Sequence, residues 1–289
     1  MNRRRGIARL AVISLLGIAV LIICLQTLLF AAEDMPASLK LTLLKVGKAD
    51  AIVVQAGAST MVVDAGEEDD GEEVVAYLAK QGVKRVDVLI ITHFDHDHVG
   101  GADYLVESVP VDRVILPDYE GSGAEYRSFL AALSGKKIVP ERLVEPVSFL
   151  LGDAEVLVEP PASYEGAGGD DSMDNDLSLI TTILHGENRL LLMGDAEKNR
   201  LRQWLSGGKA TACDFIKLPH HGVYNTELEE LLKATTPKYS AICSSQKNPA
   251  QRKTLELLKK LDVRNLQTKD GKITVLSDGK RLELHQKLH

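Results

Sequence analysis

The stretch "THFDHDHVGG", residues 92–101, places three histidines and two aspartates within six consecutive positions. The whole chain of 289 residues has only eight histidines, so this window holds an unusual share of them. The preceding segment "VDVLIIT", residues 86–92, is a run of β-branched and apolar residues that predicts a buried strand. Imidazole and carboxylate groups at the end of such a strand are ligands that zinc and similar divalent metals bind.

A bound metal explains this stretch better than a solvated polar turn does. Two carboxylates beside imidazoles repel each other and are costly to desolvate, and a divalent cation removes that cost. Two later strands end in the same kinds of residue. "MGDA", residues 193–196, brings an aspartate, and "LPHHG", residues 218–222, brings two histidines. We therefore expect three strand ends to converge on one metal site.

From residue 38 onward the chain alternates between predicted strands and predicted helices. Strands are expected over residues 39–46, 51–56, 60–66, 86–92, 112–117, 147–151, 154–160, 214–219 and 238–245, with hairpins that turn at 186–188 and 278–279. Helices are expected over residues 71–81, 101–108, 123–134, 196–206, 226–235 and 252–261. Because this pattern occurs in two successive halves, we expect an α/β fold with two sheets between outer helices, a four-layer αββα sandwich.

The first 35 residues differ from the rest. Four arginines, Arg3, Arg4, Arg5 and Arg9, precede 23 uncharged residues, 10–32. As a helix this run would span roughly 34 Å, enough for a hydrocarbon core of about 30 Å. A cleaved signal peptide is the alternative, but Leu29 and Phe30 suit a small-x-small cleavage site poorly. We therefore expect residues 1–35 to be a single-pass membrane anchor.

The arginines are expected to stay in the cytoplasm, so residues 36–289 would form one extracytoplasmic domain. That domain would be secreted if the N-terminal segment were cleaved. Without residues 1–35, the chain's 34 basic and 41 acidic residues become 30 and 39, a net charge of −9. This acidity disfavours a protein whose main task is to hold nucleic acid. Cys213 and Cys243 lie in or beside strand-like segments, where they either pair or remain as two buried thiols.

Six short motifs occur in an order that is typical of one family. They are "KVGKADA" (residues 45–51), "VDAG" (63–66), "DNDLSL" (174–179), "GDAE" (194–197), "HHG" (220–222) and the late Asn248. With the histidine-rich stretch they resemble the metallo-β-lactamase superfamily, whose signature is H-x-H-x-D-H after a strand. More specifically, they resemble the metallo-β-lactamase-like domain of the ComEC/Rec2 competence proteins. The resemblance runs from about residue 39 to residue 284.

The resemblance implies a set of functional residues and a metal cofactor. The implied ligands are His93, Asp95, Asp97, His98, Asp195 and one of His220 and His221. Asp195 would bridge two ions, and Asp97 and Asp195 would be the catalytic carboxylates. Asp64 and Asp50 would support the ligands from behind. The cofactor would be one or two zinc ions, with manganese as the alternative.

Two departures from the family pattern affect the first metal position. The third motif has Asn175, Asp176 and Ser178 where the superfamily usually has a histidine, and the late family histidine falls on Arg252. Asp95 stands in the place of the second histidine. The second position keeps its full set of ligands. Asn175 and Arg252 then become candidates for substrate binding, since a guanidinium matches the oxygens of a phosphate.

These observations predict a metal-dependent hydrolase, a phosphodiesterase or nuclease that acts outside the cytoplasmic membrane. A phosphodiester or a small molecule is the expected substrate, and nucleic acid remains open. The alternative is a non-catalytic accessory module that keeps the fold but has fewer metal ligands. The missing histidines favour that alternative. The set of His and Asp residues at three strand ends favours the enzyme, because no structural role requires them together.

Overall fold

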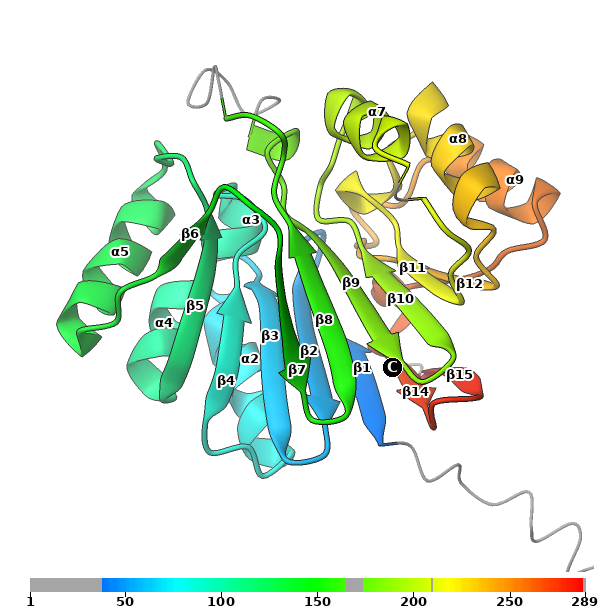
Figure 1. The fold of residues 1–289 in the computed structure, drawn as a ribbon. Coiled ribbons are helices and arrows are strands. Elements are labelled where there is room, and N and C mark those ends of the chain that lie inside the picture. Colours follow the sequence, from blue (N-terminus) through cyan, green and yellow to red (C-terminus); the bar gives the residue numbers. More distant parts are fainter. Residues whose placement is uncertain (1–37, 165–173, 209, 288–289) are drawn as a thin grey trace, which may run out of the picture. The chain divides into compact units, whose positions relative to one another are not determined.

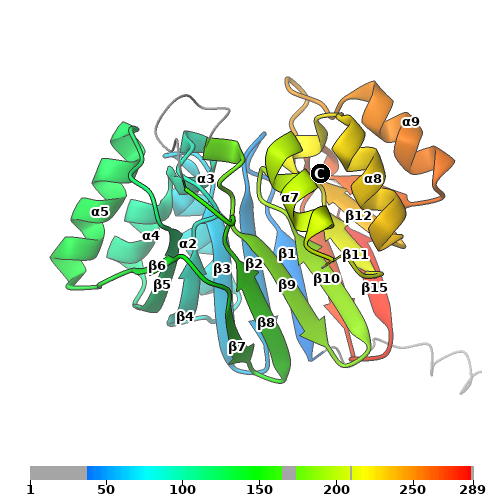
Figure 2. The same ribbon diagram turned by 45° about the horizontal axis from the view of Figure 1, so that its top comes forward.

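The computed structural model describes residues 38–164, 174–208 and 210–287. Within these residues two β-sheets pack face to face and helices cover their outer surfaces (Figures 1 and 2). One face of each sheet contacts the other sheet, and the opposite face contacts helices. The central strands, such as β3, β4 and β10, are therefore largely apolar on both faces, as expected for strands that are buried on both sides.

The first sheet contains eight strands in the order β15-β14-β1-β2-β3-β4-β5-β6. Strands β15 to β3 pair in antiparallel fashion, and β3 to β6 are parallel. Their bounds are β1 Leu39–Leu43, β2 Ala51–Ala56, β3 Ser59–Ala65, β4 Val86–Ile90, β5 Val111–Pro117, β6 Glu141–Leu143, β14 Ile273–Ser277 and β15 Leu282–Gln286. The helices that accompany this sheet are α2 Asp70–Lys80, α3 His96–Val99, α4 Ala102–Ser108 and α5 Ala124–Lys136.

The second sheet repeats this plan with seven strands in the order β13-β12-β11-β10-β9-β8-β7. Strands β7 to β10 are antiparallel, and β10 to β13 are parallel. The strands are β7 Val147–Leu151, β8 Ala154–Glu159, β9 Ile180–His185, β10 Asn188–Leu192, β11 Phe215–Lys217, β12 Tyr239–Ile242 and β13 Arg264–Gln267. The helices on this side are α7 Lys198–Ser206, α8 Thr226–Thr235 and α9 Arg252–Lys260, with 3₁₀ turns at His220–Gly222 and Thr268–Asp270.

Three apolar cores hold the layers together. One lies between the sheets, and one lies between each sheet and its helices. Strand β11 shows how alternation distributes residues between them: Phe215 belongs to the core between the sheets, and Ile216 belongs to the core under α7, α8 and α9. Because side chains alternate along a strand, Lys217 points to the same side as Phe215. A lysine therefore enters the space between the sheets.

The predicted mixed α/β sandwich is confirmed, including the hairpins and the helices that separate the strands. The short elements α3, β6 and β13 were not predicted. Cys213 and Cys243 are both free and buried, so the predicted alternative of a disulfide is wrong. The predicted anchor, residues 1–35, lies outside the described residues. Within the described part of the chain, no helix is long and apolar enough to cross a membrane.

Candidate metal centre

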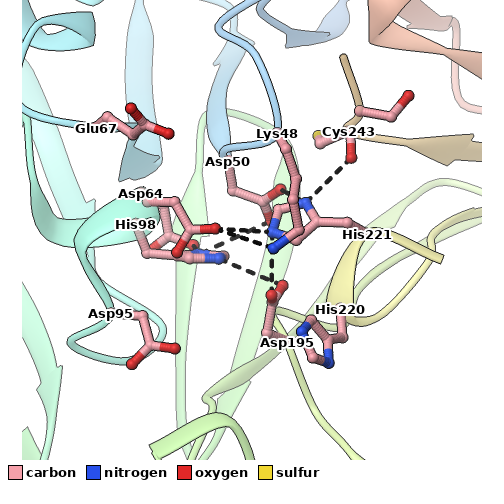
Figure 3. Close-up of polar contacts among 12 residues, drawn as sticks. Lys48, Asp50, Asp64, Glu67, Asp95, His98, Asp195, His220, His221 and Cys243 are labelled. Atoms are coloured by element: carbon pink, nitrogen blue, oxygen red, sulfur yellow. Dashed lines mark hydrogen bonds and ion pairs between the residues drawn. The ribbon is translucent and has the colours of Figure 1, made fainter. Parts of the chain in front are cut away.

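The predicted strand ends meet at one edge of the sandwich. Asp64 lies near the end of β3, and the histidine-rich stretch follows β4 and continues into α3. In the second sheet, Asp195 follows β10 and the 3₁₀ turn with the two histidines follows β11. The carboxyl ends of parallel strands share one edge of a sheet, and ligand sites of α/β proteins form there. Figure 3 shows the resulting cluster.

Four buried residues form a group that is able to hold a metal ion: Asp50, His98, Asp195 and His221. One ligand atom of each lies within 4.8 Å of the others. His98 Nε2 is 3.4 Å from Asp195 Oδ1, and His221 Nε2 is 3.1 Å from Asp195 Oδ2. Two ligand atoms about 2.1 Å from a tetrahedral ion lie roughly 3.4 Å apart. Both imidazole nitrogens therefore face the Asp195 carboxylate at spacings close to that between two ligands of an ion.

The orientation of the imidazoles provides a second test of this fit. Three buried histidines, His93, His98 and His221, each have a polar partner at Nδ1. Their Nε2 atoms form no hydrogen bond with any of the described residues. Metal-binding histidines typically use one ring nitrogen for the ion and donate from the other. Buried nitrogens without partners are otherwise costly. The Nδ1 partners are the Asp64 carboxylate for His98 at 2.8 Å, the Thr92 hydroxyl for His93 at 3.0 Å and the Cys243 carbonyl for His221 at 3.1 Å.

Asp64 fixes this arrangement from behind, where the resemblance placed it. Its carboxylate accepts hydrogen bonds from the backbone N–H and the hydroxyl of Thr92, both at 2.7 Å, in addition to the bond from His98. The backbone of Asp64 is left-handed, with φ 57°. Aspartate adopts this conformation more readily than most residues. The carboxylate is thus held rigidly in a position that sets the orientation of His98.

The turn after β11 decides which of its two histidines faces the group. His220 and His221 both have left-handed backbones, with φ of 41° and 47°. Such conformations cost of order 1–3 kcal/mol each and occur mainly at functional sites. Here they direct His221 into the group (Figure 3), whereas His220 Nδ1 lies 2.7 Å from Glu197 Oε1. Sequence reasoning left this choice open.

The two aspartates of the histidine-rich stretch lie in different places. Asp97 Oδ2 is 3.3 Å from His221 Nε2, so this carboxylate adjoins the four-residue group. Asp95 Oδ2 is 3.5 Å from His93 Nε2, and neither residue belongs to the group. The structure therefore brings the ligands of the predicted second metal position together. It leaves His93 and Asp95 as a separate pair beside them.

Opposite charges compensate for burial in this centre. Burial alone would raise the pKa of Asp195, but His221, His98 and Lys217 together hold the pKa of this carboxyl well below its usual range. Burial alone would lower the pKa of His98, and the Asp195 and Asp64 carboxylates outweigh that effect and raise it. Without a metal, Asp195 therefore favours the ionised form and His98 the protonated form. Metal binding then has to release protons, since only a neutral imidazole binds a metal.

A pocket of about 440 Å³ opens beside the group. It is lined by Asp95, Asp97, Glu125, Asp174, Asp195 and Glu197, by Lys48, and by polar residues that include His96, Asn175 and His220. Among the described residues of this lining, Lys48 is the one lysine or arginine, and its Nζ is 3.5 Å from Asp97 Oδ2. Arg252 is not part of the lining. Its side chain is 91% exposed and its Nε lies 2.9 Å from Glu256.

Two features of the centre were not predicted. Asp50, expected to lie behind the ligands, is one of the four grouped residues. Lys217 is fully buried beside it, and its Nζ donates to the Gly194 carbonyl at 3.0 Å and to Asp195 Oδ1 at 3.3 Å. The signal for Lys217 was present in the segment "DFIKLP", residues 214–219, where a charged residue follows the apolar alternation of a strand.

The fold and the donor set define a mixed α/β sandwich with a group of buried residues that is able to hold a metal ion. Residues 44–246 match the metallo-beta-lactamase superfamily, and the chain belongs to this family. It is 28% identical over 203 residues to ComE operon protein 3 of Bacillus subtilis (strain 168), a match that covers 68% of this chain and 25% of that protein. It is 27% identical over 236 residues to Recombination protein 2 of Haemophilus influenzae, which covers 80% of this chain and 27% of that protein.

The chain thus spans about a quarter of the length of these two curated relatives. Two solved structures share its fold. CmlA, a diiron beta-hydroxylase from Streptomyces venezuelae, has a TM-score of 0.53 at 16% identity, with 85% of this chain and 55% of that one covered. The metallo-beta-lactamase fold protein YhfI from Bacillus subtilis has a TM-score of 0.50 at 10% identity, with 79% and 95% covered. At these identities the similarity concerns the fold alone.

Proposed function

We propose that this chain is a metal-dependent hydrolase that cleaves a phosphodiester. One observation carries the proposal: three buried imidazoles have a polar partner at Nδ1 and no hydrogen bond at Nε2 among the described residues, and Nε2 of two of them faces the Asp195 carboxylate. Metalloenzymes need such a preorganised set of neutral nitrogen and carboxylate ligands. The ligands His98, His221, Asp195 and Asp97 suit zinc, and the share of carboxylate oxygen also suits manganese.

When bound, the ion would supply an activated water near neutral pH and a positive charge for the attacked group. Asp97 is placed to act on that water, because its carboxylate adjoins the group at His221 and also lines the pocket. We assign Asp97 the roles of orienting the water and accepting its proton. Asp195 would hold the ion, as its two oxygens face different imidazoles.

The acidic lining of the pocket restricts how an anionic substrate can bind. Six carboxylates line it, so a phosphodiester would be repelled unless positive charge were placed beside it. A bound ion provides such charge, and Lys48 provides more at the pocket wall. A phosphodiester is favoured over a neutral substrate because of Lys48 and because one relative is named for recombination. Nucleic acid is therefore one candidate, and a small phosphodiester is another.

We also propose that residues 1–35 anchor the domain to the cytoplasmic membrane with the metal centre outside the cell. The 23 uncharged residues after four arginines support this placement. Cell fractionation tests it. Recovery of the protein in the membrane fraction, with its N-terminus intact, supports an anchor. A soluble protein that begins near Glu33 would show that the segment is a cleaved signal peptide.

The test of the hydrolase uses the full chain in detergent, stripped of metal and then titrated with zinc or manganese. Metal content is measured by elemental analysis, and turnover is measured with bis(p-nitrophenyl) phosphate and with single-stranded DNA. Uptake of metal together with metal-dependent turnover supports the proposal. Uptake of metal without turnover of either substrate supports the alternative, a non-catalytic accessory module. No uptake of metal contradicts the assignment of the centre.

A further inference from the structure

A buried lysine lies inside the metal centre. Lys217 ends β11, and its side chain enters the space between the two sheets without exposure to solvent. Its Nζ contacts the Gly194 carbonyl at 3.0 Å, Asp195 Oδ1 at 3.3 Å and also Asp50 Oδ2. An ammonium has three N–H donors, and each of them has an acceptor here. The positive charge is therefore fixed in place.

Lys217 shares both of its carboxylate partners with the group that is able to hold a metal. Asp50 and Asp195 are two of its four members. An ammonium and a divalent ion at the same carboxylates compete for their oxygens and repel each other. Asp195 has its second oxygen directed to His221, away from the lysine. Asp50 differs, because its Oδ2 contacts Lys217 and its Oδ1 lies 3.7 Å from His221 Nδ1, the ring nitrogen that donates to the Cys243 carbonyl.

The charges of the centre indicate how the pair of Lys217 and Asp50 affects metal binding. Asp50, Asp97 and Asp195 bring three negative charges and Lys217 brings one positive charge. With neutral imidazoles, the remaining two negative charges match one divalent ion. Two further charged residues contact the centre from outside, Asp64 at His98 and Lys48 at Asp97, and their charges cancel. Without Lys217 the same carboxylates would carry enough charge to bind an ion more tightly, or to bind a second one.

We propose that Lys217 is a positioning residue that acts as a resident cation of the metal centre. It keeps Asp50 as its own counter-ion and out of the ligand set of the metal, and it thereby lowers the affinity for a divalent ion and limits this position to one ion. The inference rests on the metal site of the proposed function. It does not rest on the reaction, so it is tested by metal binding rather than by turnover.

The experiment compares divalent-metal binding by four full-length proteins in detergent, using zinc and manganese in isothermal titration calorimetry. Lys217→Met keeps the length of the side chain and removes its charge. Lys217→Met combined with Asp50→Asn removes both members of the pair. Lys238→Met is the matched control, because it breaks an exposed Lys–Asp pair with Asp214 at the opposite end of the same sheet. Circular dichroism checks that each protein is folded.

We expect Lys217→Met to bind metal at least about tenfold more tightly than the wild type, or to take up a second ion, because repulsion is lost and Asp50 becomes available. The double variant and the Lys238→Met control should lie within about threefold of the wild type. A merely structural lysine would weaken metal binding when removed, so the direction of the change distinguishes the two roles. Folded Lys217→Met that binds metal no more tightly than the wild type overturns the inference.

The double variant keeps the test decisive if Lys217→Met does not fold. Since both members of a buried pair leave together, no uncompensated charge remains. Affinity within about threefold of the wild type then supports the inference. A loss beyond threefold would show that Asp50 is itself a metal ligand and would overturn it. Failure of the wild-type protein to bind any metal would instead contradict the proposed function, so the two failures are distinguishable.

Discussion

The metal centre has an inner group and a rim, and they differ in how their side chains are held. The inner group consists of Asp50, His98, Asp195 and His221, and all four residues are buried. The rim consists of Lys48, Asp95, Glu197 and His220, whose side chains are between 20% and 34% exposed. Both regions derive from the same strand ends, and both are rich in ionisable residues. Their surroundings nevertheless suit them to different tasks.

The inner group is surrounded by partners that fix it from behind. The Asp64 carboxylate and the Cys243 carbonyl hold its imidazoles, and Lys217 holds its aspartates. In a low-dielectric interior such contacts are strong and leave little freedom, as a metal site requires. The rim contacts solvent, so its charges are screened and its side chains can adapt to a substrate. The difference indicates that the inner group determines metal binding and that the rim determines substrate affinity.

The largest expected effect comes from Asp195, which contacts two imidazoles of the inner group. Asp195→Ala should lower metal affinity by at least about a hundredfold and abolish turnover, because two ligand oxygens are lost and the three cationic partners of Asp195 lose a counter-ion. Elemental analysis and calorimetry measure the metal, and phosphodiester hydrolysis measures the turnover.

The matched comparison for this change is Asp95→Ala on the rim. Among the residues that the structure describes, the Asp95 carboxylate forms an ion pair with His93 at 3.5 Å, outside the four-residue group. Its removal should lower metal affinity by less than about tenfold. If Asp195→Ala keeps full metal content and activity, the turn "GDA" has a purely structural role and the division into inner group and rim is wrong.

A smaller effect is expected from a residue that supports the inner group without belonging to it. Asp64→Asn keeps the shape of the side chain, and asparagine tolerates the left-handed backbone at this position. The change weakens the hydrogen bond that orients His98, and metal affinity should fall by about 10–100-fold. Calorimetry with zinc measures the change. A protein that stays folded and keeps wild-type affinity would show that Asp64 does not orient the ligand.

Lys48 tests the proposed task of the rim. Lys48→Gln should leave metal affinity within about twofold, because the Lys48 side chain is 34% exposed and lies outside the inner group. The KM for an anionic phosphodiester should rise about fivefold with little change in kcat, since an exposed ionic contact contributes no more than about 1 kcal/mol. Steady-state kinetics at two salt concentrations measure both quantities. An unchanged KM at low salt would contradict the proposed contact between Lys48 and the substrate.

The same division explains what the sequence predicts and what it does not. Each motif follows an apolar strand, and the carboxyl ends of parallel strands share an edge, so the convergence of His98, Asp195 and the turn with His220 and His221 is predictable. The choice between His220 and His221 is not, because it depends on two consecutive left-handed residues that no periodic pattern indicates. The three-residue strand β6 and the four-residue helix α3 are too short to show a period.

The sequence motifs did not single out Lys217, and they placed Asp50 behind the ligands. The reason for both outcomes is a different one. The strand of Lys217 was predicted, but the sequence does not show which partner a buried charge finds across two sheets. Asp50 belongs to the first sheet and Lys217 to the second, and they are separated by more than half of the chain. A lysine at an inward position of an apolar strand indicates that a carboxylate lies opposite it, since buried ammonium groups are otherwise strongly disfavoured. Only the three-dimensional fold identifies this carboxylate as Asp50.

The smallest effect is expected from Arg252, a residue that the resemblance placed near the substrate. The Arg252 side chain is 91% exposed, contacts Glu256 one turn further along α9, and does not line the pocket. Arg252→Ala should therefore change metal affinity, kcat and KM by less than about twofold, because an exposed pair of this kind contributes little. Kinetics with single-stranded DNA provide the sharpest measurement, since a long substrate extends beyond the pocket.

A KM that rises for DNA but not for bis(p-nitrophenyl) phosphate would show that Arg252 contacts a distant part of a polymer. The rim would then extend over the N-terminus of α9, and nucleic acid would be favoured over a small phosphodiester as the substrate.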